Sequence, residues 1–135
     1  MAVFIDTCIL VALHNAEDKN HQRSIELIKN ALKGDFGRIF TSDYIIDEAV
    51  TAALARTGRH DIAVDLGKSI IESPRITKLV IDQDTFMMAW AKFKKIEDKT
   101  LSFTDCTSLA ITEKHGIKQV MSFDCGFDGL TQRIS

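Results

Sequence analysis

Ala2-Val3-Phe4-Ile5-Asp6-Thr7 opens the chain with a short apolar run that ends on an acid. Near the other end, Val120-Met121-Ser122-Phe123-Asp124 has a similar form. Short apolar runs of this kind predict buried strands. An acid directly after a buried strand rarely has only a structural task, so Asp6 is the first candidate for a functional site. Asp124 is a second candidate, although an aspartate can also begin a turn.

The rest of the chain alternates β-rich runs with segments of helical periodicity. The predicted strands are residues 2–5, 38–40, 76–81 and 119–121. Between them, apolar residues recur at helical spacing, in the sets Ile25, Ile28 and Leu32; Ile62, Leu66 and Ile70; Phe86, Trp90 and Phe93; and Cys106, Leu109 and Ala110. Gly34 and Gly116 stand where helices should end. This alternation predicts an α/β fold, a three-layer α/β/α sandwich with a mostly parallel central sheet, in a single domain spanning residues 1–135.

The composition is that of an ordinary globular domain. The 135-residue chain is 45% hydrophobic and 27% charged, with a formal net charge of −2. This balance argues against nonspecific coating of DNA, but not against a nuclease whose metal ions supply local positive charge. The apolar runs are too short to span a bilayer and Asp6 interrupts the first of them, so we expect no signal peptide, no membrane association and a cytoplasmic location.

Two further acids fall within predicted helices. Glu48 lies about two turns into a helix expected over residues 43–56, and Asp105 lies in the first turn of one that runs to about His115. Each has a structural alternative, because Glu48 could be a solvated helix residue and Asp105 could form a capping box with Ser102. A helix N-terminus also favours negative charge, which would keep the Asp105 carboxylate ionised.

The expected fold can gather these acids in one place. In parallel sheets, ligands bind outside the carboxyl ends of the strands, where Asp6 and Asp124 are expected to lie. Carboxylates that are brought together repel, by roughly 4 kcal/mol per close pair at an effective dielectric of about 20. Chains keep such clusters mainly to bind hard cations through oxygen ligands. Asp6, Glu48, Asp105 and Asp124 therefore predict a metal-dependent enzyme.

Other patterns give weaker indications. Cys8, Cys106 and Cys125 show no CxxC spacing, and each lies within two residues of one of the acids. We interpret them as small buried residues beside the site rather than as thiolate ligands, which would favour zinc. The four histidines are scattered, and there is no nucleotide-binding glycine motif and no hydrolase nucleophile elbow.

An aromatic stripe and a run of lysines precede Asp105. We interpret the stripe of Phe86, Trp90 and Phe93 as core rather than as a platform for stacking bases. The lysines form either a solvated face or contacts to a phosphate backbone; they are Lys92, Lys94, Lys95 and Lys99.

Taken together, these segments resemble a PIN domain, the nuclease fold of many VapC-type toxins. The resemblance spans nearly the whole chain and rests on four pieces: Val3-Phe4-Ile5-Asp6-Thr7, Glu48 on a helix, Leu101-Ser102-Phe103-Thr104-Asp105, and Ser122-Phe123-Asp124. It implies a ribonuclease that uses one or two Mg²⁺ or Mn²⁺ ions. The metal-site carboxylates would be Asp6, Glu48, Asp105 and Asp124, with Thr7 and Ser122 as hydroxyl supports. It also implies a homodimer and, for the toxins, a small antitoxin protein.

We therefore expect hydrolysis of RNA phosphodiester bonds by a metal-activated water that attacks phosphorus in line. The resemblance implies products with 5′-phosphate and 3′-hydroxyl ends. A phosphorelay receiver would need an acidic neighbour beside Asp6, and a haloacid-type phosphatase would need an acid where Cys8 stands. The stronger alternative is a catalytically silent PIN-fold scaffold that binds RNA or protein.

Overall fold

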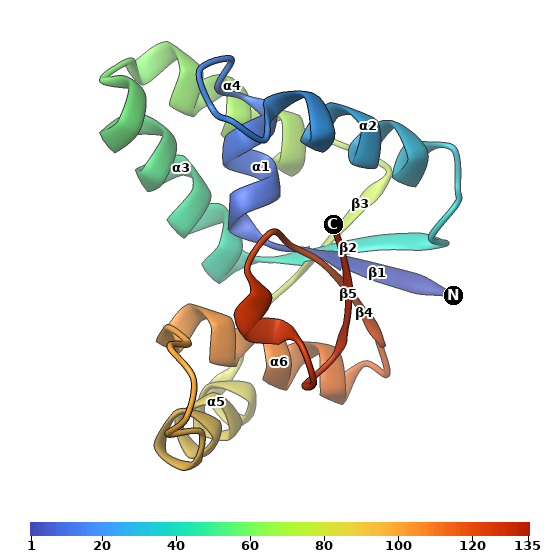
Figure 1. Ribbon diagram of the computed structural model, residues 1–135, viewed down its shortest axis with the longest axis vertical. Coiled ribbons are helices and arrows are strands. Elements are labelled where there is room, and N and C mark those ends of the chain that lie inside the picture. Colours follow the sequence, from blue (N-terminus) through green and yellow to red (C-terminus); the bar gives the residue numbers. More distant parts are fainter.

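The computed structural model, which describes residues 1–135, contains one five-stranded sheet in the order β3-β2-β1-β4-β5. All neighbouring strands run parallel. The strands are β1 (Ala2–Ile5), β2 (Arg38–Ser42), β3 (Ile76–Leu79), β4 (Gln119–Met121) and β5 (Gln132–Ile134). The helices are α1 (Thr7–Leu13), α2 (His21–Leu32), α3 (Asp43–Thr57), α4 (His60–Ile71), α5 (Gln83–Lys95), α6 (Phe103–Lys114) and the short 3-10 helix η1 (Cys125–Phe127). Figure 1 shows α1 to α4 above the sheet and α5 and α6 below it, so the predicted three-layer α/β/α fold is confirmed.

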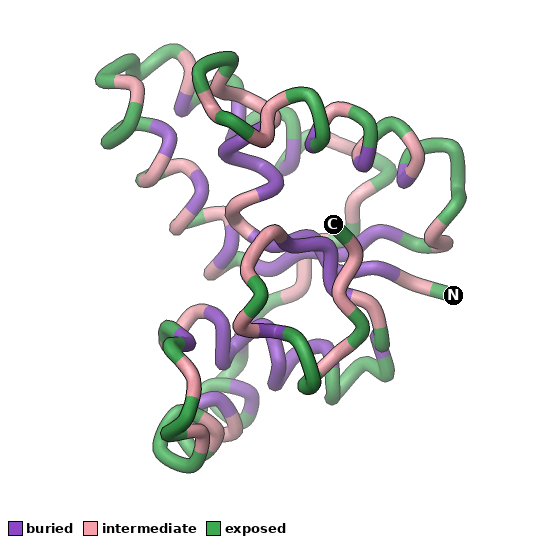
Figure 2. The backbone as a smooth tube through the Cα atoms, in the orientation of Figure 1, coloured by how far each residue is buried: buried purple, intermediate pink, exposed green.

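Strand β1 forms the centre of the core. Val3, Phe4 and Ile5 are each 1% exposed or less. The strand pairs with β2 on one edge and with β4 on the other, and helices cover both faces of the sheet. A strand buried on both faces carries a continuous apolar run rather than an alternating one. The buried colour along the central strands in Figure 2 follows this pattern.

The predicted strands correspond to four of the five observed strands. Residues 2–5 and 119–121 match β1 and β4, whereas β2 continues to Ser42 and β3 ends at Leu79. The sequence pattern does not predict α1 or β5. The expected helix ends are confirmed, because Gly34 and Gly116 follow α2 and α6 with φ of 95° and 67°. None of the helices is long and apolar enough to cross a membrane.

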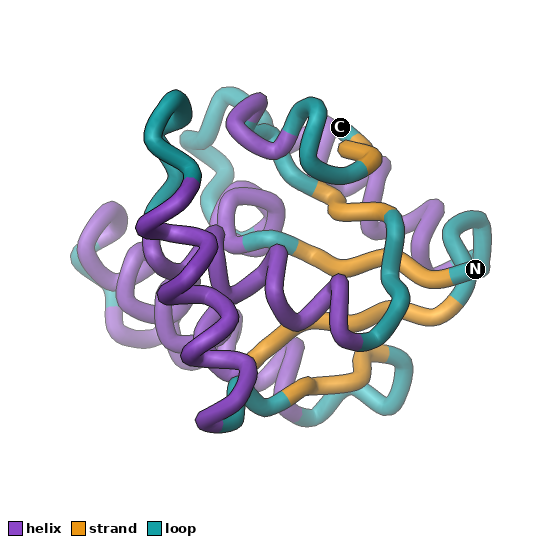
Figure 3. The backbone as a smooth tube through the Cα atoms, turned by 90° about the horizontal axis from the view of Figure 1, so that it is seen from below, coloured by secondary structure: helices purple, strands orange, loops and turns teal.

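The interpretation of the aromatic stripe as core is wrong. Phe86, Trp90 and Phe93 are 37%, 42% and 42% exposed. Helix α5 packs against α6 through a different face, which buries Thr85 and Ala89. Figure 3, in which the molecule is seen from below, shows helices in front of the sheet on the side where Figure 1 places α5 and α6. The aromatic rings therefore line the outside of the molecule, where Trp90 and Phe93 stack at 6.0 Å between centroids.

Candidate active site

Asp6 and Asp124 follow two adjacent strands at the point where the strand order changes direction. The chain proceeds from β1 outward to β2 and β3 on one side, and β4 and β5 lie on the other. Asp6 comes directly after β1, and its backbone N–H donates to the carbonyl of Met121 at the end of β4. Crevices at such switch points, outside the carboxyl ends of the strands, are where open α/β sheets bind ligands.

The Asp6 carboxylate is buried and only partly hydrogen-bonded. Asp6 is 3% exposed and begins α1, yet its side chain makes no capping hydrogen bond to that helix. Its Oδ2 accepts a hydrogen bond from the Ser122 hydroxyl at 2.7 Å. Its Oδ1 is buried and has no hydrogen-bond partner. Because buried polar atoms are nearly always paired, the unpaired oxygen indicates a position prepared for a ligand.

Burial disfavours the charged form of this carboxylate. The pKa of Asp6 is raised from 3.8 to about 6, mainly because the carboxylate is removed from water. The Ser122 hydrogen bond opposes this rise, and the negative charge of Asp105 contributes to it. A cation bound at Oδ1 would reverse this effect, because a positive charge stabilises the ionised form.

Asp105 has both a structural and an electrostatic role at the start of α6. It forms the capping box expected with Ser102: its backbone N–H donates to the Ser102 hydroxyl at 3.0 Å, while its own Oδ2 accepts from the Ser102 N–H at 2.9 Å. Burial raises the pKa of Asp105, and the charges of Asp124 and Glu48 raise it further. The capping box holds one carboxylate oxygen and leaves the other available to the site.

The structure brings the other two acids into the electrostatic range of Asp105. Glu48 is half-buried on α3, which Ser42 caps through a hydrogen bond from the Ile45 N–H. Asp124 is half-buried before η1, and its Oδ1 accepts from the Gly126 N–H at 2.8 Å. The acids lie near one another without already forming a metal-binding group of three or more side chains. A divalent ion would therefore have to draw them together.

The two predicted hydroxyl residues are placed differently. Ser122 Oγ links both strands, because it donates to Asp6 Oδ2 and accepts from the Asp124 N–H at 3.0 Å. Thr7 Oγ1 is buried beside Asp6 and has no hydrogen-bond partner. Ser122 therefore orients a carboxylate, while the Thr7 hydroxyl remains available to a ligand.

The cysteines do not behave as one class, and the interpretation of all of them as small buried residues is wrong. Cys106 is buried, but Cys125 is exposed. Cys8 is half-buried, and its sulfur lies 3.3 Å from Ser122 Oγ and 3.5 Å from Asp6 Oδ2. Burial and the Asp6 charge raise the pKa of the Cys8 thiol to about 12, so the group stays protonated. In the sequence, the one sign of these contacts is that Cys8 lies two residues after Asp6.

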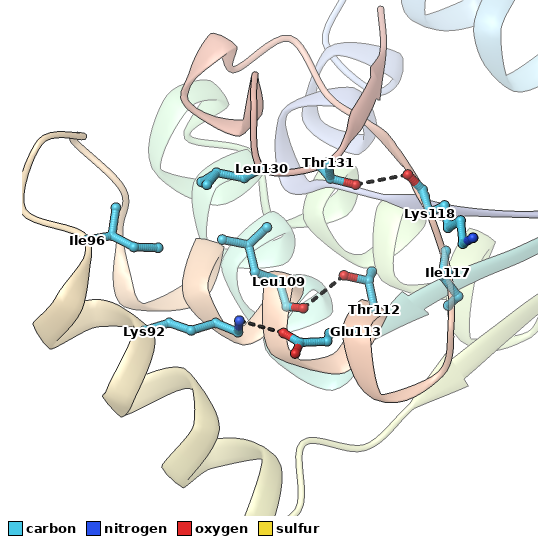
Figure 4. Close-up of a pocket in the computed structure, with 9 residues that line it drawn as sticks. All are labelled: Lys92, Ile96, Leu109, Thr112, Glu113, Ile117, Lys118, Leu130 and Thr131. Atoms are coloured by element: carbon cyan, nitrogen blue, oxygen red, sulfur yellow. Dashed lines mark hydrogen bonds and ion pairs between the residues drawn. The ribbon is translucent and has the colours of Figure 1, made fainter.

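A well-formed pocket lies away from the acids. It has a volume of about 300 Å³ and contains none of the candidate site residues. Figure 4 shows it between α5, α6 and the segments before β4 and β5, with an ion pair between Lys92 and Glu113 at its edge. Its lining residues are Lys92, Ile96, Leu109, Thr112, Glu113, Ile117, Lys118, Leu130 and Thr131. This pocket therefore does not mark the candidate active site.

Comparison with known proteins identifies the family. The model of the PIN domain family matches residues 3–131. The chain belongs to the PIN domain family. The match covers the segments that carry Asp6, Glu48, Asp105 and Asp124.

This PIN domain is similar along nearly its whole length to several VapC proteins. A VapC ribonuclease of Archaeoglobus fulgidus is 27% identical over 94% of this chain and 80% of its own length. The 23S rRNA-specific endonuclease VapC20 of Mycobacterium tuberculosis is 26% identical over 93% of this chain and 91% of its own. Its crystal structure, described as a sarcin–ricin loop cleaving toxin, superposes with a TM-score of 0.83 at 29% identity, over 93% of this chain and 92% of that one. A toxin–antitoxin complex from Klebsiella pneumoniae shares the fold, with a TM-score of 0.63 at 17% identity over 100% of this chain and 97% of that one.

The donor atoms of the PIN domain site fit a hard divalent cation. All four acids offer carboxylate oxygens, which Mg²⁺ and Mn²⁺ prefer. Asp6 Oδ1 and Thr7 Oγ1 are buried oxygens with no partner in the protein. Nitrogen and thiolate ligands, which would suit a softer metal, are absent from this set, since Cys8 has a raised pKa and no histidine belongs to it.

Proposed function

We propose that the protein is a VapC-type endoribonuclease that hydrolyses RNA phosphodiester bonds with Mg²⁺ or Mn²⁺. The observation that carries this proposal is the buried Asp6 carboxylate, whose Oδ1 has no partner and which lies within the electrostatic range of Asp105. Keeping an unpaired carboxylate oxygen in the interior is costly unless a ligand compensates it. The similarity to VapC ribonucleases along nearly the whole chain supports RNA as the substrate.

In this proposal Asp6 and Asp105 hold the cation directly, and Glu48 and Asp124 contact it directly or through water. When bound, the cation supplies a water of lowered pKa and balances the charge that develops on the phosphate. Ser122 fixes the orientation of Asp6, and the capping box fixes that of Asp105. These hydrogen bonds set the orientation of these two carboxylates before the substrate arrives.

The substrate and the partners belong to the same proposal. Because the relative VapC20 is named for 23S rRNA and a sarcin–ricin loop, we propose a structured loop of ribosomal RNA as the first substrate to test. A small antitoxin is proposed as the inhibitor, on the basis of the toxin–antitoxin complex with the same fold. Co-expression with the product of the neighbouring reading frame tests this: the two chains should purify together, and cleavage should be lost in the complex.

We also propose that the protein is a homodimer, with the exposed aromatic stripe of α5 in the interface. Large apolar side chains gathered on one exposed face indicate a contact surface. Trp90 is 42% exposed and lies outside the acidic cluster. Light scattering should show a dimer for the wild type and a monomer for Trp90→Glu. A wild-type monomer at high concentration, or a Trp90→Glu dimer, would contradict this assignment.

The decisive experiment compares RNA cleavage by the wild type and Asp105→Asn. Asparagine keeps an acceptor oxygen for the Ser102 N–H, so the capping box and the fold are preserved while the charge is removed. Asp47→Asn is the matched control, because Asp47 is exposed on the same helix as Glu48 and makes no side-chain hydrogen bond. Each protein is assayed on 23S rRNA with Mn²⁺ and with EDTA.

We expect metal-dependent cutting by the wild type and by Asp47→Asn, and none by Asp105→Asn. The products should carry 5′-phosphate and 3′-hydroxyl ends. Products with a 2′,3′-cyclic phosphate would mean that the RNA's own 2′-hydroxyl attacks, and would refute hydrolysis by a metal-activated water. Absence of cutting by a wild type that binds Mn²⁺ would favour the silent scaffold.

A further inference from the structure

The Cys8 thiol lies at a junction between the two strands that carry Asp6 and Asp124. Cys8 is in the first turn of α1, two residues after Asp6. Its sulfur accepts a hydrogen bond from the Phe123 N–H at 3.2 Å. The same sulfur lies 3.3 Å from Ser122 Oγ and 3.5 Å from Asp6 Oδ2. One side chain therefore contacts the carboxylate after β1 and the backbone after β4.

The available protons define the direction of these hydrogen bonds. Ser122 has one hydroxyl proton, and the 2.7 Å contact with Asp6 Oδ2 uses it. The Ser122 oxygen also accepts from the Asp124 N–H. The thiol proton of Cys8 therefore goes to Asp6 Oδ2 or to the Ser122 oxygen, while the Cys8 sulfur accepts from Phe123. Two oxygens beside the junction, Asp6 Oδ1 and Thr7 Oγ1, are buried and remain without a partner.

We propose that Cys8 is a positioning residue for the metal site. This inference rests on the proposed function. Together with Ser122, it holds Asp6 Oδ2 away from the cation so that Oδ1 faces it. It also anchors the Phe123 N–H, and so fixes the segment that presents Asp124. Cation affinity thus depends on a side chain that is not itself a ligand.

The contacts distinguish this role from ligation and from simple packing. The sulfur already accepts from Phe123, and the thiol proton is needed as a donor within the junction. Cys106 provides the comparison for packing, because it is buried in an apolar cluster contributed by α5, α6 and η1 and forms no side-chain hydrogen bond. Groups that orient metal ligands through hydrogen bonds typically change metal affinity about 10- to 100-fold when they are removed.

The test is a calorimetric titration with Mn²⁺ of the full-length wild type, Cys8→Ala, Cys8→Ser and Cys106→Ala. Cys8→Ala removes both hydrogen bonds of the sulfur and should weaken Mn²⁺ binding by about tenfold or more. Cys8→Ser keeps one donor and one acceptor and should restore most of the affinity. Cys106→Ala should bind as the wild type does. Cys8→Val, which fills the space without hydrogen bonding, replaces Cys8→Ala if the smaller side chain does not fold.

Three outcomes would overturn the inference, and they differ in what they imply. Equal Mn²⁺ affinity in the wild type and Cys8→Ala would remove the positioning role and leave the proposed function intact. A loss that Cys8→Ser does not recover, with a larger loss for Cd²⁺ than for Mn²⁺, would make Cys8 a thiolate ligand instead. A wild type that binds no Mn²⁺ would overturn the proposed metal site and the positioning role together.

Discussion

Replacing Asp6 by asparagine should stabilise the metal-free protein while abolishing its metal response. The pKa of Asp6 rises from 3.8 to about 6 on folding, mainly because the carboxylate is buried. This rise corresponds to about 3 kcal/mol of folding free energy that is lost when the group ionises in the interior. Asparagine carries no charge and still offers an oxygen to the Ser122 hydroxyl, so most of that free energy should be recovered.

The pH dependence follows from the direction of the pKa change. Below the unfolded pKa of 3.8, Asp6 is protonated in both states and imposes no penalty. As the pH rises through the folded pKa of about 6, the penalty grows to its full value. The stabilisation by Asp6→Asn should therefore be about 2–3 kcal/mol at neutral pH, equivalent to roughly 7–10 °C in Tm, and should vanish in acid.

The assay is urea unfolding in EDTA at several pH values, followed by circular dichroism. Asp47→Asn is the control for removal of one negative charge, because its carboxylate is exposed. The reasoning would be refuted if Asp6→Asn destabilised the protein at neutral pH, or if its effect were the same in acid. Either result would mean that the protein already compensates the buried carboxylate through contacts other than a cation.

The remaining predictions concern the metal, the loop that holds Asp124, and a helix cap. Mn²⁺ at a hundred times its dissociation constant should raise the unfolding free energy of the wild type by about 2.7 kcal/mol in urea titrations, and should leave Asp105→Asn unchanged. Gly126→Ala should weaken Mn²⁺ binding in calorimetry, because its Cβ would lie 3.1 Å from Asp124 Oδ1 and 3.0 Å from Leu101 Cδ2. Unchanged affinity would mean that the site does not depend on the present position of the Asp124 side chain. Ser42→Ala should cost about 1 kcal/mol of stability through loss of the α3 cap, and a cost near zero would show that this hydrogen bond does not contribute to stability.

The fold was predictable where apolar residues recur at a clear spacing or where a polar or capping residue marks the end of an element. β1 and β4 are buried apolar runs that end at polar residues, and the capping box at Ser102 marks the start of α6. Helix α1 was missed because TCILVAL is apolar on nearly every side and too short to show a period. β5 was missed because three residues at the edge of a sheet carry no alternation that distinguishes them from a loop.

The candidate site was predictable in its acids but not in its supports. Strand ends and helix starts place acids near the switch point from local sequence alone. The contact of Cys8 with Ser122 joins residues 114 positions apart, and no local pattern encodes it. The prediction that the aromatic stripe belongs to the core failed for a related reason. Helical spacing shows that Phe86, Trp90 and Phe93 share a face of α5, but it does not show which face of α5 packs against α6.

The hydrogen bond between Asp6 and Ser122 has a consequence for biosynthesis. It joins the first strand made on the ribosome to one of the last, across 116 residues. A chain that has grown only through α4 has no Ser122 to orient Asp6 and no Asp124 to complete the acidic cluster. The site therefore assembles only when translation is nearly finished. If these acids form the active site, we expect the protein to stay inert until its last strands have been made.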